Sequence, residues 1–171
     1  KEMAELDTTP EQKRQTIELL MERTMDFHKR GIEVEILTTD NHADGIYLLQ
    51  YLEKHQPERV EEVLQLLEMH GGCSAGQKTS NVDPQGNVHA CQFWGQKSLG
   101  NVREKKFSEI WRDSQDKFLC SMREKHLHLE GRCGECRYKM FCGGCRIRAE
   151  AVTGGNIWAE DPACYLTDWK E

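Results

Sequence analysis

The feature that most constrains this chain is the spacing of its cysteines, of which there are eight. The densest group occupies residues 133–145 and reads Cys-Gly-Glu-Cys, then five residues, then Cys-Gly-Gly-Cys. Four soft sulfur ligands so close together predict a bound metal or cluster, because each Cys-x-x-Cys turn lets two thiolates converge on one site. Three more cysteines lie outside this group. The seven that we take together are Cys73, Cys91, Cys133, Cys136, Cys142, Cys145 and Cys164.

Three uses of these cysteines compete. Disulfides are disfavoured, because neighbouring Cys-x-x-Cys pairs are strained as structural bridges and favour redox or metal chemistry. A zinc ribbon separates its two pairs by about 12 to 20 residues, so that each pair lies on its own hairpin, whereas the gap here is five residues. Iron–sulfur clusters accept close and uneven spacing, since a cluster spans several ångströms and recruits distant cysteines. The spacing therefore favours iron–sulfur over zinc.

The size and texture of the chain suggest how it is organised. With 171 residues and 37% hydrophobic content, it can form one ordinary domain, or the end of one domain plus a small module. Such a module has a small core and needs disulfides or a bound metal to stabilise it. We place a boundary near Gly71. Residues 1–70 are expected to be regular structure, and residues 71–171 to be a module rich in Gly, Cys and turns.

Charge and hydropathy exclude two classes of partner. The net charge of −6 and the mixed signs along the chain argue against nucleic acid. No apolar run approaches the roughly 20 residues of a membrane span, so we expect a soluble, cytoplasmic protein. The N-terminus reads Lys-Glu-Met-Ala-Glu without an initiator Met, which is the pattern of a mature or truncated chain.

The N-terminal part predicts a helix followed by a strand. Thr8 and Glu11 form a capping-box pattern, with a proline in the first turn and apolar residues at helical spacing up to Gly31. Apolar residues then alternate with glutamates over 32–36, as in a strand with one buried face. A helix that leads into a strand suits the last unit of a partial (β/α) barrel. The polar loop 38–45 would follow the carboxyl end of this strand, where α/β enzymes bind ligands.

Further along, the pattern predicts short helices and one hairpin. Helices are expected over Ile46–Lys54, Glu58–Met69 and Ser114–Lys125. Residues Asn81–His89 read as a tight hairpin, with Pro and Gly at the turn and Val on both arms. The remainder is expected to be cysteine-rich loop. The predicted fold class is α+β: the last helix and strand of a partial (β/α) barrel, then a small, loop-rich module with a β-hairpin and short helices, stapled by iron–sulfur clusters.

The order of the cysteines matches a known pattern. It runs Cys-x12-Gly-x4-Cys from Cys73 through Gly86 to Cys91, continues with the group at 133–145, and ends at Cys164. This order resembles the SPASM module of radical S-adenosylmethionine enzymes, in which two auxiliary [4Fe–4S] clusters interleave their ligands. The usual pattern has three residues before the fourth cysteine of the middle group, whereas this chain has two.

The resemblance implies how the cysteines divide between the two clusters. One auxiliary [4Fe–4S] cluster would take Cys133, Cys136, Cys142 and Cys164. The second auxiliary cluster would take Cys73, Cys91 and Cys145. No fourth cysteine is left for this second cluster, so its remaining position is open to substrate or to His70, His89 or Asp83, although each of these can also be a plain surface or turn residue. Cys120 falls outside the pattern, on a predicted helix, and is expected to be a buried thiol.

Two flanking segments narrow the resemblance. They are the loop Thr39–Gly45, which reads Thr-Asp-Asn-His-Ala-Asp-Gly, and residues 146–165, which contain Arg-Ile-Arg-Ala-Glu-Ala-Val-Thr-Gly and Asp-Pro-Ala-Cys-Tyr. Together they resemble the radical enzymes that modify sirohaem-derived tetrapyrroles, in alternative haem biosynthesis and in haem d1 biosynthesis. The resemblance implies oxidative removal of acetate side chains from didecarboxysiroheme to give Fe-coproporphyrin III. A SPASM peptide maturase and a non-enzymatic, zinc-stapled interaction module are the alternatives.

The same resemblance implies a substrate and partners. The substrate would be the tetrapyrrole didecarboxysiroheme, and an external electron donor or acceptor would serve the clusters. His42 and Asp44 would line the substrate site or ligate the iron of the substrate. Arg146 and Arg148 would pair with tetrapyrrole carboxylates, which planar guanidinium groups suit. Charge balance for the clusters is the alternative role of these arginines.

One motif of the family is absent from this sequence. Radical cleavage of S-adenosylmethionine needs a Cys-x3-Cys-x2-Cys loop that holds a third [4Fe–4S] cluster, and no cysteine here lies four positions before another. We therefore expect a C-terminal fragment that is inactive alone, with S-adenosylmethionine and its cluster bound by the missing N-terminal part. A separate cluster-binding subunit is the other interpretation, although half a barrel would expose its apolar edge.

Overall fold

The computed structural model describes residues 6–39, 41–113 and 115–170. Two residues named above, Asp40 in the polar loop and Ser114 at the expected start of a helix, lie outside these ranges. The elements in chain order are α1 (Pro10–Lys29), α2 (Ala43–His55), η2 (Pro57–Arg59), α3 (Val60–His70), β1 (Asn81–Val82), β2 (Asn87–His89), β3 (Gly100–Asn101), α4 (Phe107–Trp111), α5 (Lys117–Arg123), η3 (Lys125–Leu127), α6 (Gly131–Glu135) and α7 (Arg146–Thr153).

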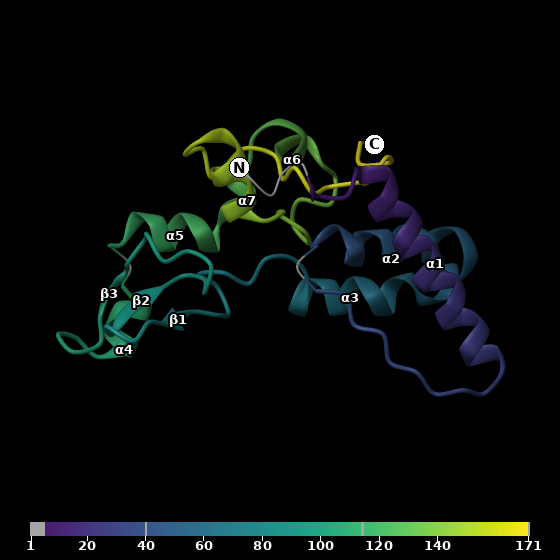
Figure 1. Ribbon diagram of the computed structural model, residues 1–171, viewed down its shortest axis with the longest axis horizontal. Helices are drawn as coiled ribbons and strands as arrows, with labels where there is room; N and C mark the ends of the chain where they lie inside the picture. The colour runs from purple at the N-terminus through teal and green to yellow at the C-terminus, as the bar shows by residue number, and fades with distance from the viewer. Residues whose placement is uncertain (1–5, 40, 114, 171) are drawn as a thin grey trace.

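These elements form two groups joined by the C-terminal third of the chain. Helices α1, α2 and α3 gather on one side of the molecule, and the small sheet lies on the other side with α4 and α5 (Figure 1). Helices α6 and α7 lie above both groups in the same view. This mixture of helices with a small antiparallel sheet is in keeping with the α+β class. None of the helices that the structure describes is long and apolar enough to cross a membrane.

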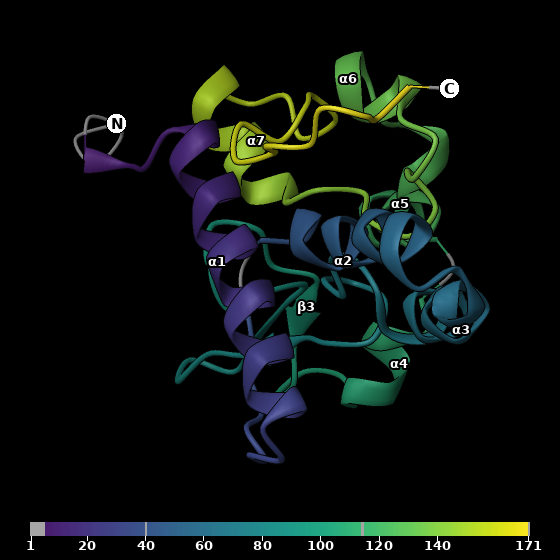
Figure 2. The same cartoon turned by 90° about the vertical axis from the view of Figure 1, so that its right-hand side faces the viewer.

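Helix α1 confirms the first predicted helix, with a shift of one residue at its start. The N-cap is Thr9, not Thr8, and the capping box pairs it with Gln12. The Gln12 N–H donates to Thr9 Oγ1 at 3.2 Å, and the Thr9 N–H donates to Gln12 Oε1 at 2.8 Å. These two bonds satisfy two N–H groups that a helix start otherwise leaves without partners. The helix then runs down one edge of the molecule (Figure 2).

The strand predicted over 32–36 is wrong. These residues form an extended loop at the edge of the molecule (Figure 1), and the Ile32 and Val34 side chains are 39% and 44% exposed. An alternating pattern becomes a strand only when a neighbouring strand satisfies its N–H and C=O groups. Among the described residues, the sheet contains β1, β2 and β3 alone, and none of them pairs with this segment.

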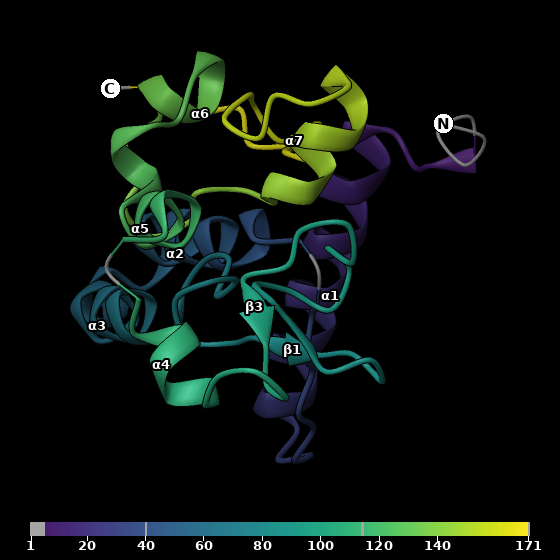
Figure 3. The ribbon, with the colours of Figure 1, turned by 90° about the vertical axis from the view of Figure 1, so that its left-hand side faces the viewer.

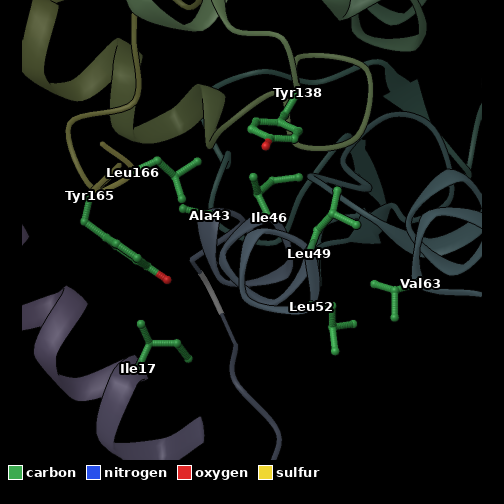
Figure 4. Packing of buried hydrophobic residues seen from close by; sticks show 9 residues of the cluster. All are labelled: Ile17, Ala43, Ile46, Leu49, Leu52, Val63, Tyr138, Tyr165 and Leu166. Carbon is green, nitrogen blue, oxygen red and sulfur yellow. The ribbon is translucent and has the colours of Figure 1, made fainter. Parts of the chain in front are cut away.

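The two helices predicted after this loop are confirmed as α2 and α3, with η2 between them at Pro57. Their apolar faces form a core with Ile17 of α1 and with residues from within and after the cysteine group. In Figure 4 the side chains of Ile46 and Leu49 from α2 lie beneath Tyr138. The buried members of this core are Ile17, Ala43, Ile46, Leu49, Leu52, Val63, Tyr138, Tyr165 and Leu166. The start of α2 is thereby held against the C-terminal part of the chain.

The predicted hairpin is confirmed as β1 and β2, which pair antiparallel with Asn81 opposite His89. The turn between them contains Gly86 at φ +91°, a backbone conformation that favours glycine. Strand β3 adds to β2 on its other side, which the sequence pattern did not indicate. Helix α5 lies above β3 and α4 below it (Figure 3).

The cysteine-rich remainder is more regular than expected, because α6 and α7 form within it. A second core lies beneath them. Its buried members are Cys73, Ala75, Ala90, Trp94, Met122 and Ile157. Trp94 is fully buried, and its indole N–H donates to the Glu150 carboxylate of α7 at 2.6 Å. This bond fixes the loop after Cys91 against α7.

Candidate metal centre

Four cysteines surround one small cavity, which we call the four-cysteine cavity. They are Cys133, Cys136, Cys142 and Cys164. Cys133 lies in α6 and Cys136 is the residue that ends it. The Cys142 N–H bonds back to the Tyr138 carbonyl at 3.0 Å, in the turn that follows. Cys164 comes from the distant segment after Asp161. The structure therefore brings together the four residues that the resemblance groups on one cluster.

Two glycines shape this cavity. Gly143 and Gly144 follow Cys142 with φ angles of +66° and +57°, and both line the cavity. A Cβ at Gly144 would lie 2.6 Å from Arg146 Nη2 and 2.7 Å from Asp161 Cβ, closer than atoms can approach. Only glycine therefore allows the chain to turn so tightly between Cys142 and Cys145.

The lining of the four-cysteine cavity fits an anionic iron–sulfur cluster. Arg132 and Lys139 contribute to it, and both can offset thiolate charge. Arg132 Nε is buried without a hydrogen-bond partner, the one such side-chain N or O atom in the described part of the chain. An unpaired buried N–H is costly, and a cluster sulfur would satisfy it. Cys133 Sγ already accepts from the Asp161 N–H at 3.3 Å and from Arg146 Nη2 at 3.9 Å.

Burial changes the acidity of three thiols in this cavity. It raises the pKa of Cys136 and of Cys164, and it raises the pKa of Cys142 to about 12. The cause is that a thiolate loses its hydration in the interior. These thiols are therefore neutral at physiological pH until a metal displaces their protons.

The other three cysteines line a second, larger cavity of about 610 Å³, which we call the three-cysteine cavity. They are Cys73, Cys91 and Cys145. His42, Arg146 and Arg148 also line it. The cavity lies between the loop that follows β2 and the start of α7. The structure thus separates the seven cysteines into the same sets of four and three that the resemblance implies.

Neither cavity has the geometry of a site for a single metal ion. Within residues 6–39, 41–113 and 115–170, no three Cys, His, Asp or Glu side chains converge closely enough to bind one ion. The cysteines of each set instead line the wall of a cavity. Such an arrangement suits a group with several metal atoms, each bound by one thiolate at its own corner.

The predicted substrate residues His42 and Asp44 have different surroundings. His42 lines the three-cysteine cavity, whereas Asp44 lines a separate one beside α1. The Asp44 carboxylate accepts a 2.7 Å hydrogen bond from the Tyr165 hydroxyl, and burial together with this carboxylate raises the pKa of Tyr165. Burial, helped by the nearby Arg148 charge, lowers the pKa of His42 to about 4, so that its ring is neutral at physiological pH.

The two arginines at the start of α7 are already bonded within the chain. Arg146 is completely buried, and its Nη1 donates to the carbonyls of Ile157 and Ala159 at 3.0 and 2.6 Å. Arg148 makes a two-pronged ion pair with the buried Asp161, with N–O distances of 3.0 and 2.9 Å. Both nevertheless line the three-cysteine cavity. Their guanidinium groups therefore border whatever this cavity binds, with the charge of Arg148 offset by Asp161.

The candidates for a fourth ligand of the second cluster, His70, His89 and Asp83, lie elsewhere. None of them lines the three-cysteine cavity. The His89 ring uses both nitrogens, Nδ1 with the Lys97 carbonyl at 2.8 Å and Nε2 with the Asp83 carboxylate at 3.0 Å. This pairing raises the pKa of His89 and, with the bonds from Asn87, lowers that of Asp83. His70 is exposed at the end of α3. Cys120 lies on a helix, α5, as expected, but its side chain is half-buried and not buried.

Sequence reasoning missed two residues that position the cysteines. Asp161 accepts hydrogen bonds from the N–H groups of Cys145 and Ala163 and from Arg148. Burial alone would raise its pKa, but these donors outweigh burial and lower it. Lys125 donates to the Cys73 carbonyl, and burial lowers its pKa. The position of Asp161 three residues before Cys164 was a signal of its role. Nothing in the sequence pattern indicated the role of Lys125.

The class of protein follows from this geometry together with a family comparison. Residues 73–137 match the SPASM family, described as an iron–sulfur cluster-binding domain. The chain therefore carries a SPASM domain. The match ends before Cys142, Cys145 and Cys164, so the grouping of these three cysteines rests on the two cavities.

The chain is also similar to several curated proteins. The chain is 46% identical to Fe-coproporphyrin III synthase of Methanosarcina barkeri, over 96% of this chain and 42% of that protein. It is 40% identical to pre-heme d1 synthase of Dinoroseobacter shibae, over 90% of this chain and 38% of that protein. It is 38% identical to AdoMet-dependent heme synthase of Methanosarcina barkeri, over 60% of this chain and 28% of that protein. The chain thus spans less than half the length of these relatives. No solved structure matches it.

Proposed function

We propose that this chain is the auxiliary-cluster part of a radical S-adenosylmethionine enzyme of sirohaem-dependent haem biosynthesis. The enzyme would remove acetate side chains oxidatively from didecarboxysiroheme to give Fe-coproporphyrin III. Similarity to Fe-coproporphyrin III synthase over 96% of the chain supports this reaction. The sequence contains no Cys-x3-Cys-x2-Cys loop, so the chain alone would not cleave S-adenosylmethionine.

The observation that carries the proposal is the division of seven cysteines between two cavities. The four-cysteine cavity would hold one [4Fe–4S] cluster and the three-cysteine cavity a second. When bound, such clusters accept or pass on electrons, at potentials set by charge, hydrogen bonds and exposure. We assign residues 71–171 to this module, and residues 1–70 to the end of the barrel with its linking helices.

The residues of the chain would support the two clusters in different ways. Around the four-cysteine cavity, Arg132 would donate its unpaired Nε–H, and Arg146 would donate to Cys133 Sγ. Both contacts stabilise negative charge on sulfur. In the three-cysteine cavity, Arg148 contributes a guanidinium group, whose charge Asp161 partly offsets, and guanidinium groups also suit the carboxylates of a tetrapyrrole. The volume of about 610 Å³ leaves room for a ligand beside a cluster.

The cofactor assignment is tested by analysing the anaerobically reconstituted chain. We expect about eight iron and about eight sulfide per chain, with broad visible absorbance that bleaches on reduction. A colourless chain that binds zinc stoichiometrically would reject the clusters and favour a zinc-stapled module.

The reaction is tested with the full-length enzyme that contains this sequence. Incubation with didecarboxysiroheme, S-adenosylmethionine and a reductant should give a product that mass spectrometry identifies as having lost both acetate groups. An unchanged tetrapyrrole in the presence of intact clusters would reject the proposed reaction without affecting the cofactor assignment.

A radical enzyme of haem d1 biosynthesis is the second candidate. It is favoured by the 40% identity to pre-heme d1 synthase over 90% of this chain. The same incubation separates the two candidates, because the mass spectrum reports which side chains of the tetrapyrrole have changed.

A further inference from the structure

The three-cysteine cavity has a fourth side chain of ligand type. Cys73, Cys91 and Cys145 come from three segments that are distant in sequence, and His42 comes from a fourth. Among the lining residues that the structure describes, no other is a His, Asp or Glu. A [4Fe–4S] cluster has four irons, each with one position for an outer ligand, and imidazole can replace thiolate on an iron.

The polar loop before α2 is held so that His42 stays at this cavity. His42 is the N-cap residue of α2, with helical backbone angles (φ −66°, ψ −14°). On one side, Asn41 Nδ2 donates to the Ala163 carbonyl at 3.3 Å. On the other side, Asp44 accepts from the Tyr165 hydroxyl at 2.7 Å. Both partners flank Cys164, so the loop is tied to the cysteine-bearing segment more than 110 residues later.

The ring of His42 is available, unlike those of His55, His89 and His128. His89 has both ring nitrogens engaged, and the rings of His55 and His128 lie against Tyr51 and Trp158. For His42, no hydrogen bond or ring contact links it to the described part of the chain. Neither of its ring nitrogens is among the fully buried atoms without a partner, and His42 lines the three-cysteine cavity. A ligand bond to iron would satisfy one of them.

We infer that His42 is the fourth protein ligand of the cluster held by Cys73, Cys91 and Cys145. This inference rests on the proposed function, because it requires a cluster in the three-cysteine cavity. It assigns the loop before α2 to cluster binding. It also gives the second cluster one iron that is bound by an imidazole nitrogen, whereas the other three are bound by cysteine sulfurs. Imidazole ligation also raises the reduction potential of that cluster relative to four thiolates.

The test is pulsed electron paramagnetic resonance on the reduced, reconstituted chain, with and without ¹⁵N-labelled histidine. We expect a strong nitrogen coupling that changes with the label and is absent from His42→Ala. In His42→Cys, which supplies a thiolate, the cluster should persist without nitrogen coupling and with a lower reduction potential. His70→Ala is the matched control, because it removes an exposed histidine outside the cavity, and its coupling should equal that of the parent chain.

The outcomes separate this inference from the proposed function. A chain with two intact clusters but no histidine coupling would overturn the assignment of His42 alone, as would a coupling that survives in His42→Ala. A chain that binds no iron would overturn both proposals. Loss of coupling in His42→Ala and in His42→Cys, with iron content retained in His42→Cys, supports the assignment.

Discussion

The backbone N–H of Cys145 donates a 2.7 Å hydrogen bond to the Asp161 carboxylate, and this contact connects the two cysteine cavities. Cys145 belongs to the three-cysteine cavity, whereas the Asp161 backbone N–H bonds to Cys133 of the four-cysteine cavity. One buried residue therefore holds ligands of both proposed clusters. It remains ionised there because Arg148 pairs with it.

Asp161→Asn should weaken both clusters. An amide cannot replace the two charge-assisted bonds to Arg148, and loss of a hydrogen bond to a charged group costs about 1.5–3 kcal/mol. We expect iron release to a chelator to become about tenfold faster or more, since about 1.4 kcal/mol corresponds to a factor of ten. Time-resolved absorbance measures this rate.

The control for this variant is Asp168→Asn, since the Asp168 side chain is 60% exposed and its partner is an exposed lysine. Surface ion pairs contribute little, so iron release should be unchanged. If Asp161→Asn and Asp168→Asn released iron at the same rate, Asp161 would not couple the two sites.

Gly144→Ala should disrupt the turn between the two cysteine sets. The methyl group would lie 2.6 Å from Arg146 Nη2 and 2.7 Å from Asp161 Cβ, and φ at this residue is +57°. Gly154→Ala is a matched control, because φ there is +76° but no atom lies within 4 Å of the added carbon.

Both variants bear the cost of a left-handed backbone, about 1–2 kcal/mol, and Gly144→Ala adds the clash, about 1–3 kcal/mol more. Thermal unfolding of the cluster-loaded proteins should therefore show a larger decrease in Tm for Gly144→Ala. Equal decreases would mean that the close contacts at Gly144 have no energetic weight.

Metal removal should loosen one part of the chain selectively. The regular elements within residues 131–166 are the two short helices α6 and α7, and a bound cluster would supply much of the stability of this segment. Helices α2 and α3 instead belong to an apolar core, to which α2 contributes Ile46 and Leu49 and α3 contributes Val63. In hydrogen exchange, we expect the apo chain to lose amide protection over 131–166 and to retain it in α2 and α3. Unchanged protection in the cysteine segment would contradict a stapling role for the metal.

The cysteine pattern carried most of what could be predicted about the site. The spacing around Cys133 and Cys142 reflects local turns, which sequence encodes directly, and the same sets of cysteines line the two cavities. The confirmed helices α2 and α3 likewise follow from local apolar periodicity.

The missed features depend on contacts between distant residues. The alternating segment at 32–36 had the right period for a strand, but a strand needs a partner, and the described sheet offers it none. His42 lines the cavity of three cysteines, and its loop is bonded to the C-terminal segment through Asp44 and Tyr165, which are 121 residues apart. Local patterns do not encode such contacts.

The central claim is that the seven cysteines bind two separate clusters. Native mass spectrometry of the anaerobically reconstituted chain tests it directly, with the paired variants Cys133→Ala/Cys142→Ala and Cys73→Ala/Cys91→Ala. We expect the parent chain and Cys120→Ala to carry two [4Fe–4S] masses, and each paired variant to carry one, about four iron. Loss of all iron from both paired variants, or a single metal ion in the parent chain, would contradict the division into two clusters.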